Sequence, residues 1–131
     1  MIVDSSAVLA VLFREPEAET YEELISDSHC RMSTANALES AMVAEGRRSH
    51  GAAELFDDFR EWSGIELVPI TFDHFSAARK AWRRFGKGRH PAALNFGDCF
   101  AYALATIEDE PLLFKGLDFS RTDIRPAFKH G

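Results

Sequence analysis

The first thirteen residues constrain the fold of this chain more than any other stretch. Ile2 and Val3 form a short apolar β-type run that ends in Asp4, and residues 7–13 continue as a helix that is apolar on every side. Such a helix is expected to be buried, with Ser5 or Ser6 as its N-cap. A strand this short lies deep in a sheet only if the sheet grows outward from it. Asp4 is therefore predicted at the carboxyl edge of a central strand, where open α/β sheets hold ligands, although it can equally serve as a helix cap.

Strand-like and helix-like segments alternate along the rest of the chain. Further strands are predicted at residues 29–33, 65–70 and 111–114, with a short fifth strand at 122–124. Helices are predicted over residues 17–27, 35–48, 50–62, 72–85 and 96–108, with Thr34 and Thr71 as caps. The core face of the 72–85 helix is predicted to carry Phe72, Phe75, Ala78, Trp82 and Phe85. This alternation predicts one α/β domain over residues 1–131, a five-stranded parallel sheet between two layers of helices.

The composition excludes several classes of protein. A chain of 131 residues that is 46% hydrophobic can build a sizeable core. No apolar run approaches the ~20 residues that cross a bilayer, and no basic segment precedes the first apolar stretch, so we expect a cytoplasmic protein without a membrane segment. Cys30 and Cys99 lack the spacing of a metal site or a disulfide scaffold, and the five histidines are scattered. A zinc site is therefore not expected.

The charge is acidic in total but uneven along the chain. A net charge of −6 argues against a protein that coats nucleic acid through bulk charge. Residues 74–97, however, contain no acid and hold six of the fifteen basic side chains. A polyanion would have to meet this patch, and its centre is formed by Arg83, Arg84, Lys87 and Arg89. The alternative is that these cations only stabilise a helix C-terminus.

Four acids are placed where carboxylates need an explanation. Glu39 and Asp98 lie on the apolar faces of their predicted helices, and Asp118 follows the fourth strand at the same sheet edge as Asp4. Singly, each can be a cap, a solvated end or a salt-bridge partner. Together they would repel one another unless a cation neutralised them. An all-oxygen ligand set suits Mg²⁺ or Mn²⁺, and this predicts hydrolysis of phosphodiester bonds.

Four motifs follow one another in a recognisable order: Ile2-Val3-Asp4-Ser5-Ser6-Ala7, Ser33-Thr34 with Glu39, Asn95-Phe96-Gly97-Asp98-Cys99 with residues 101–105, and residues 113–119. In these motifs the chain resembles the PIN-domain ribonucleases, and among them the VapC toxins of bacterial toxin–antitoxin pairs. The segment around Asp98 is the most specific of the four. The resemblance covers almost the whole chain and implies a three-layer α/β/α fold of the PIN type.

The resemblance also implies roles for individual residues and partners. Asp4, Glu39 and Asp98 would be the catalytic and metal-binding acids, with Asp118 as a more variable fourth. Ser5, Ser6, Asn95 and Thr122 would support them by hydrogen bonding. The RNA-binding residues are predicted from the charge pattern instead, and they are Arg83, Arg84, Lys87 and Arg89. The cofactor would be Mg²⁺, with Mn²⁺ as a possible substitute. The protein would form a homodimer and a heterotetramer or larger complex with a cognate VapB-type antitoxin, covering the first helix and residues 35–62.

Other functions remain open at this stage. The nearest is a PIN-fold nuclease that acts on DNA or structured nucleic acid outside a toxin–antitoxin pair. A receiver domain needs an acid pair at the first strand, where Asp4 is followed by serines, and a haloacid-dehalogenase-like phosphatase needs an acid where Ser6 stands. A non-catalytic α/β signalling or binding module would leave Glu39 and Asp98 unexplained.

Overall fold

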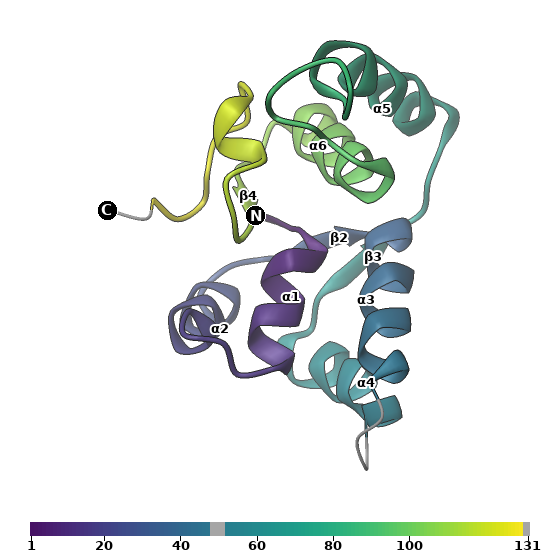
Figure 1. Cartoon of the computed structure of the whole chain (residues 1–131). Helices are drawn as coiled ribbons and strands as arrows, with labels where there is room; N and C mark the ends of the chain where they lie inside the picture. Colours follow the sequence, from purple (N-terminus) through teal and green to yellow (C-terminus); the bar gives the residue numbers. More distant parts are fainter. Residues whose placement is uncertain (48–51, 130–131) are drawn as a thin grey trace.

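The computed structural model describes residues 1–47 and 52–129 of the chain (Figure 1). The elements follow the predicted alternation of strands and helices. In chain order they are β1 (Ile2–Val3), α1 (Ser5–Leu12), α2 (Ala18–Ser26), β2 (Arg31–Ser33), α3 (Thr34–Gly46), α4 (Ala52–Ser63), β3 (Glu66–Val68), α5 (Phe72–Phe85), α6 (Phe96–Glu108), β4 (Leu112–Leu113) and the 3₁₀ turn η1 (Phe119–Arg121). The predicted junction of the 35–48 and 50–62 helices falls partly on residues 48–51, outside the described residues.

The strands form one parallel sheet in the order β3-β2-β1-β4. β1 therefore lies inside the sheet, as predicted from its position before the buried helix. Ile2 pairs with Arg31 of β2 on one side and with Leu112 of β4 on the other. The carboxyl end of β1 is held by the backbone N–H of Asp4, which donates to the carbonyl of Leu113 at 2.9 Å.

The prediction of a fifth strand at residues 122–124 is wrong for the described chain, in which the sheet has four strands. Thr122 ends η1 instead, and its hydroxyl accepts a hydrogen bond from the N–H of Ile124 within a turn. The chain reaches β4 a little later, through an isolated bridge between Leu112 and Pro126. This bridge consists of two hydrogen bonds, from the N–H of Leu112 to the carbonyl of Arg125 and from the N–H of Ala127 to the carbonyl of Leu112, and it does not lengthen into a ladder.

Helices cover both faces of the sheet, and this confirms the predicted layers. Figure 1 shows α5 and α6 on one side of the strands and α1 to α4 on the other. Successive strand residues point to opposite faces. Ile2 and Leu112 accordingly pack into the core beneath α5 and α6, while Val3 and Leu113 pack among α1 to α4. Within the residues that the structure describes, no helix is long and apolar enough to cross a membrane.

Helix α1 is buried along most of its length, as its uniformly apolar sequence predicts. Ala7, Val8, Ala10 and Val11 are all inaccessible or nearly so. Of the cap residues considered, the structure selects Asp4, the stated alternative to the serines, and both serines lie inside the helix. Similarly, Ser33 rather than Thr34 caps α3, whereas Thr71 caps α5 as predicted. In each case the cap has an extended backbone, and its side chain accepts from an N–H in the first turn.

The predicted core face of α5 is only half correct. Ala78 and Phe85 are buried, but Phe72, Phe75 and Trp82 remain 77%, 52% and 43% exposed. The core beneath α5 includes Ala78, Ala81 and Phe85, whereas the other three aromatic side chains of the predicted face stay outside it. Helical periodicity identified one apolar stripe, but it could not tell which part of that stripe another element covers.

Candidate metal centre

Asp4 stands at the carboxyl end of the central strand with only 2% of its surface exposed. Its Oδ2 accepts hydrogen bonds from the N–H of Ser6 at 3.0 Å and from the Ser6 hydroxyl at 2.6 Å. Its Oδ1 is buried and has no hydrogen-bond partner among the described residues. One oxygen thus caps α1 while the other is left for a ligand, so the cap and the ligand interpretations of Asp4 are compatible.

Both serines after Asp4 contact the acids, as the resemblance implied. The Ser6 hydroxyl donates to Asp4 and also accepts from the backbone N–H of Lys115, just after β4, at 2.9 Å. The Ser5 hydroxyl donates to Oε1 of Glu39 at 2.5 Å. These bonds connect α1 to α3 and to the end of β4, and they fix the orientations of two carboxylates.

Glu39 projects from α3 against the N-terminus of α6. A methyl group at Gly97 would lie only 2.6 Å from Oε2 and 2.7 Å from Oε1 of Glu39, so glycine is what allows this approach. Buried Asn36, one turn earlier on α3, donates its side-chain amide to the carbonyl of Gly97 at 2.9 Å. Ser40 in turn donates to the carbonyl of Asn36 at 2.8 Å.

Sequence reasoning missed the positioning roles of Asn36 and Gly97. The only local signal was a polar Asn36 on the inner side of α3, because a glycine has no side chain to mark a contact. The contact joins residues about sixty positions apart in the chain, so the sequence of either helix alone could not reveal it.

Asp98 is held by the first turn of α6. Its Oδ2 accepts from the N–H of Asn95 at 3.0 Å, while Oδ1 of Asn95 accepts from the N–H of Asp98 at 2.9 Å. This reciprocal capping box satisfies two N–H groups at the helix start. It gives Asn95 a definite supporting contact, because the asparagine fixes the backbone and the carboxylate of Asp98 together.

The acids interact electrostatically. Burial raises the pKa of Asp4 to about 7, with further increases from the charges of Asp98 and Glu39, against the hydrogen bonds from Ser6 that lower it. Burial likewise raises the pKa of Asp98 to about 6, and the charges of Asp118 and Glu39 add to it. We call Asp4, Glu39, Asp98 and Asp118 the acidic site, since the charge of Asp98 or Glu39 acts on Asp4 and the charge of Glu39 or Asp118 acts on Asp98.

Asp118 and Thr122 are the remaining predicted residues of the site. Asp118 is exposed at the start of η1, near enough to Asp98 to raise its pKa. Thr122 donates to the carbonyl of Phe119 at 2.7 Å and so stabilises its own turn. A supporting role for Thr122 at the acidic site therefore stays a prediction.

The acidic site has the donor chemistry of a hard divalent cation. All its ligand atoms are oxygens, and the buried Oδ1 of Asp4 lacks a partner among the described residues. In the part of the chain that the structure describes, no three acidic, histidine or cysteine side chains form a complete metal-binding group. Mg²⁺ usually retains several waters and takes only one or two carboxylates, so the residues present fit this ion.

The predicted RNA-binding cations lie at the end of α5 and in the loop after it. Arg83 and Lys87 are exposed. Arg84 forms an ion pair with Asp123 at 3.2 Å, and the guanidinium of Arg89 lies 4.1 Å from the centre of the Trp82 ring. Of the four, Arg84 and Arg89 are thus already engaged within the protein.

A four-stranded parallel sheet with this acidic site at its carboxyl edge defines an α/β protein suited to bind a divalent cation. A family model of the PIN domain matches residues 1–125. Ribonuclease VapC30 of Mycobacterium tuberculosis is 47% identical over 95% of each chain, and a ribonuclease VapC of Mycolicibacterium smegmatis is 46% identical over 95% of this chain and 97% of that relative. The chain belongs to the PIN-domain family and, within it, to the VapC ribonucleases.

A solved structure supports the fold independently. The crystal structure of Mycobacterium tuberculosis VapC20, described as a Sarcin-Ricin loop cleaving toxin, superposes with a TM-score of 0.73. The match covers 95% of this chain and 98% of VapC20 at 19% sequence identity. This likeness confirms the PIN-type architecture.

Proposed function

We propose that this protein is a Mg²⁺-dependent endoribonuclease of the VapC type, with Mn²⁺ as a possible substitute. The observation that carries the proposal is the buried Asp4 carboxylate. One of its oxygens has no partner among the described residues, and the charges of Glu39 and Asp98 act on its pKa. Such a group is costly unless a cation meets it. The VapC ribonucleases that are similar over nearly their whole length support RNA as the substrate.

Each residue of the acidic site has its own role in this proposal. Asp4 and Asp98 would hold the ion, with Glu39 and Asp118 acting directly or through water. A bound ion would supply an activated water and neutralise charge on the scissile phosphate. Ser6 keeps the capping oxygen of Asp4 turned toward α1 and leaves Oδ1 for the ligand. Ser5 and Gly97 hold the Glu39 carboxylate between α1 and α6.

The ends of the products test this chemistry. Attack by water should leave a 5′-phosphate on one fragment and a free 3′-hydroxyl on the other, with no product in excess chelator. Sequencing of the RNA ends generated by the purified protein measures both and also locates the cleavage site. A 2′,3′-cyclic phosphate would show that the RNA itself is the nucleophile and would refute the proposal. A DNA oligonucleotide of the same sequence tests the alternative substrate.

The cations at the end of α5 and in the loop after it would guide RNA toward the acidic site. Arg83 and Lys87 are exposed, and the loop that follows them leads to the helix of Asp98. For single-stranded RNA, each phosphate contact contributes about −0.7 to the slope of the logarithm of affinity against the logarithm of salt concentration. Changing both Arg83 and Lys87 to alanine should therefore flatten this salt slope by about 1.4. Arg14→Ala, which removes a cation paired with Glu22, is the control and should leave the slope unchanged. An unchanged slope in the double variant would place the RNA path elsewhere.

A VapB-type antitoxin would bind beside the acidic site. The antitoxin contact expected on α1 can involve only a small surface, because that helix is mostly buried. Leu38, Met42 and Val43 of α3 are instead exposed, and with Phe96 they line a hollow of about 300 Å³ that includes Glu39. Apolar side chains of the antitoxin would fill this hollow, and a basic side chain would approach the acids. In the cleavage assay above, adding the protein encoded by the neighbouring small gene should prevent the formation of both RNA fragments.

The remaining partner assignments rest on the family. We propose a homodimer that joins the antitoxin in a heterotetramer or larger complex in the cytoplasm. Sedimentation of the chain alone and with its antitoxin measures both assemblies, and a monomer at micromolar concentration would contradict the dimer.

A further inference from the structure

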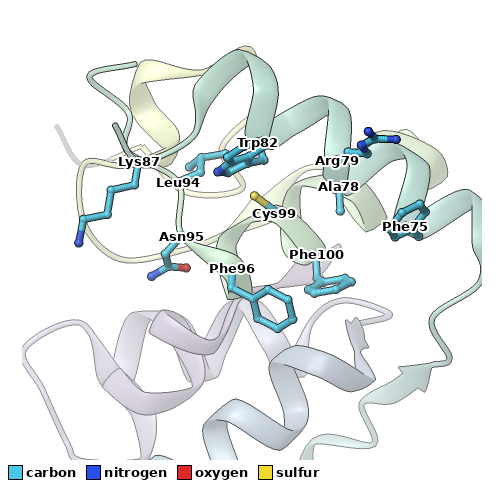
Figure 2. A pocket seen from close by; sticks show the side chains of 10 residues that line it. All are labelled: Phe75, Ala78, Arg79, Trp82, Lys87, Leu94, Asn95, Phe96, Cys99 and Phe100. Atoms are coloured by element: carbon cyan, nitrogen blue, oxygen red, sulfur yellow. The ribbon is translucent and has the colours of Figure 1, made fainter. Parts of the chain in front are cut away.

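A second hollow lies between α5 and α6 (Figure 2). Its volume is about 500 Å³, within the range of pockets that hold small organic groups. Its walls are aromatic: Phe75 and Trp82 come from α5, and Phe96 and Phe100 come from α6. We call it the aromatic pocket. It contains part of the α5 stripe that was predicted to lie in the core.

The aromatic pocket leaves apolar rings exposed in one place. Phe96 is 80% exposed, and its ring packs edge-on against Phe100 at 5.0 Å between centroids. Exposed apolar groups gathered in this way mark binding surfaces rather than ordinary protein surface. The rings of Phe75 and Trp82 on the opposite wall belong to the same hollow. The pocket therefore offers faces on which a flat ring can stack.

Trp82 is fixed in position before any ligand arrives. The guanidinium of Arg89 lies 4.1 Å from its ring centre. On another side, a methyl group at Gly86 would come within 2.5 Å of Cδ1 of the indole, so the loop backbone lies directly against it. A pre-organised aromatic ring loses little freedom on binding, which favours stacking with a partner.

The charges of the aromatic pocket favour a polyanionic ligand. Lys87 and Arg79 stand at its opposite ends, with Trp82 and Cys99 between them (Figure 2). None of the described residues that line it is acidic. A nucleotide brings a flat apolar base and a negative phosphate.

The position of the aromatic pocket connects it to the chemistry. Asn95 and Cys99 line it, and Asp98 stands between them in the sequence. Asn95 is also the residue whose N–H holds Oδ2 of Asp98. Phe96 also lines the hollow that includes Glu39, so a nucleotide whose phosphate lies at the acidic site would have a neighbouring base within reach of the aromatic pocket.

We infer that the aromatic pocket binds an unpaired nucleobase of the RNA next to the scissile phosphate, by stacking against Trp82 and the phenylalanines. This inference rests on the proposed ribonuclease function and adds to it a second point of substrate contact. It also implies that the cleaved RNA is single-stranded at this position, because a paired base cannot leave its stack without cost.

The test measures binding of a labelled single-stranded oligoribonucleotide that spans the mapped cleavage site, in chelator so that it stays intact. Trp82→Ala should weaken binding roughly tenfold, a typical loss for one stacked base, while Trp82→Phe should stay near wild type. Trp62→Ala is the matched control, since Trp62 is also a half-exposed tryptophan but lies on α4 and does not line the pocket. Its affinity for RNA should be unchanged.

A second arm avoids any effect of mutation on folding. Oligoribonucleotides with a single abasic nucleotide, moved through the positions around the cleavage site, are bound to the wild-type protein. One position should show the same roughly tenfold loss, and that loss should vanish in Trp82→Ala because the two changes remove one contact. Trp82→Ala should also lower the rate of cleavage at limiting RNA more than at saturating RNA.

The outcomes separate this inference from the proposed function. If the wild-type protein cleaves RNA but no abasic position weakens binding, or the abasic loss persists in Trp82→Ala, the inference is wrong and the ribonuclease stands. If Trp82→Ala dissociates an oligomer and leaves RNA affinity unchanged, the pocket is a contact between copies and the inference is again wrong. If the wild-type protein neither binds nor cleaves RNA, the proposed function itself fails.

Discussion

Replacing Asp98 by asparagine is expected to reduce RNA cleavage by more than roughly a hundredfold while the chain remains folded, because metal stabilisation of transition-state charge is worth several kcal/mol. The amide oxygen of an asparagine can still accept from the N–H of Asn95, so the capping box at the start of α6 survives. What disappears is the negative charge that would hold the ion. Single-turnover cleavage with saturating Mg²⁺ measures the loss.

The same variant should change stability with a definite dependence on pH. The pKa values of Asp4 and Asp98, about 7 and about 6, lie above the usual value for aspartate, so the metal-free folded state binds more protons than the unfolded state in this range. The free energy of unfolding therefore decreases as the pH rises from about 4 to about 7. Asp98→Asn removes one of these charges, so the metal-free variant should melt at a higher temperature than wild type at pH 8. At pH 4 the two should converge.

A matched control separates the acidic site from a general effect of removing charge. The control is Asp109→Asn at the other end of α6. Asp109 is exposed and has a left-handed backbone conformation, which asparagine also adopts readily. This control should cleave RNA normally and should not show the pH-dependent gain in melting temperature. Added Mg²⁺ should stabilise wild type more at pH 8 than at pH 5, because protons compete with the ion. Full activity of Asp98→Asn, or of wild type in excess chelator, would contradict the metal mechanism.

The sequence predicted the parts of this protein that depend on local pattern. Ile2-Val3-Asp4 is a strand followed by a carboxylate, and parallel topology alone then places Asp4 at the ligand edge of the sheet. A period of 3.6 residues placed Glu39 and Asp98 on the apolar faces of their helices, and both are half-buried, although Met42 and Val43 on the face of Glu39 are exposed. These inferences needed no knowledge of which helices touch.

Contacts between distant segments could not be derived in this way. The approach of Glu39 to Gly97 and the bond from Asn36 to the Gly97 carbonyl depend on how α3 crosses α6. The exposed rings of α5 depend on where α6 stops covering them, and the missing fifth strand depends on the path of the chain around Pro126. In each case the decisive quantity is the distance between two elements, which neither element encodes alone.

Replacing Gly97 by alanine is expected to lower RNA cleavage by at least roughly tenfold without unfolding the protein, as for other residues that orient metal ligands. The new methyl group would lie 2.6 to 2.9 Å from the carboxylate of Glu39, closer than atoms can pack. Helix α6 is not free to withdraw, because Asn36 holds the carbonyl of Gly97 at 2.9 Å. Glu39 must therefore swing away and lose its hydrogen bond from Ser5.

The cost to stability should be small, because the displaced atoms are the end of a flexible side chain and alanine favours a helix by about 1 kcal/mol over glycine. Thermal melting and cleavage should therefore separate, with the first nearly unchanged and the second lost. Gly46→Ala is the control, since a methyl group there meets nothing within 4 Å among the residues that the structure describes. In a background with the shorter Glu39→Asp, the added methyl group should cost less activity than in wild type, because the carboxylate has already retreated. Equal losses in both backgrounds, or full activity of Gly97→Ala, would show that the position of Glu39 against α6 does not matter for cleavage.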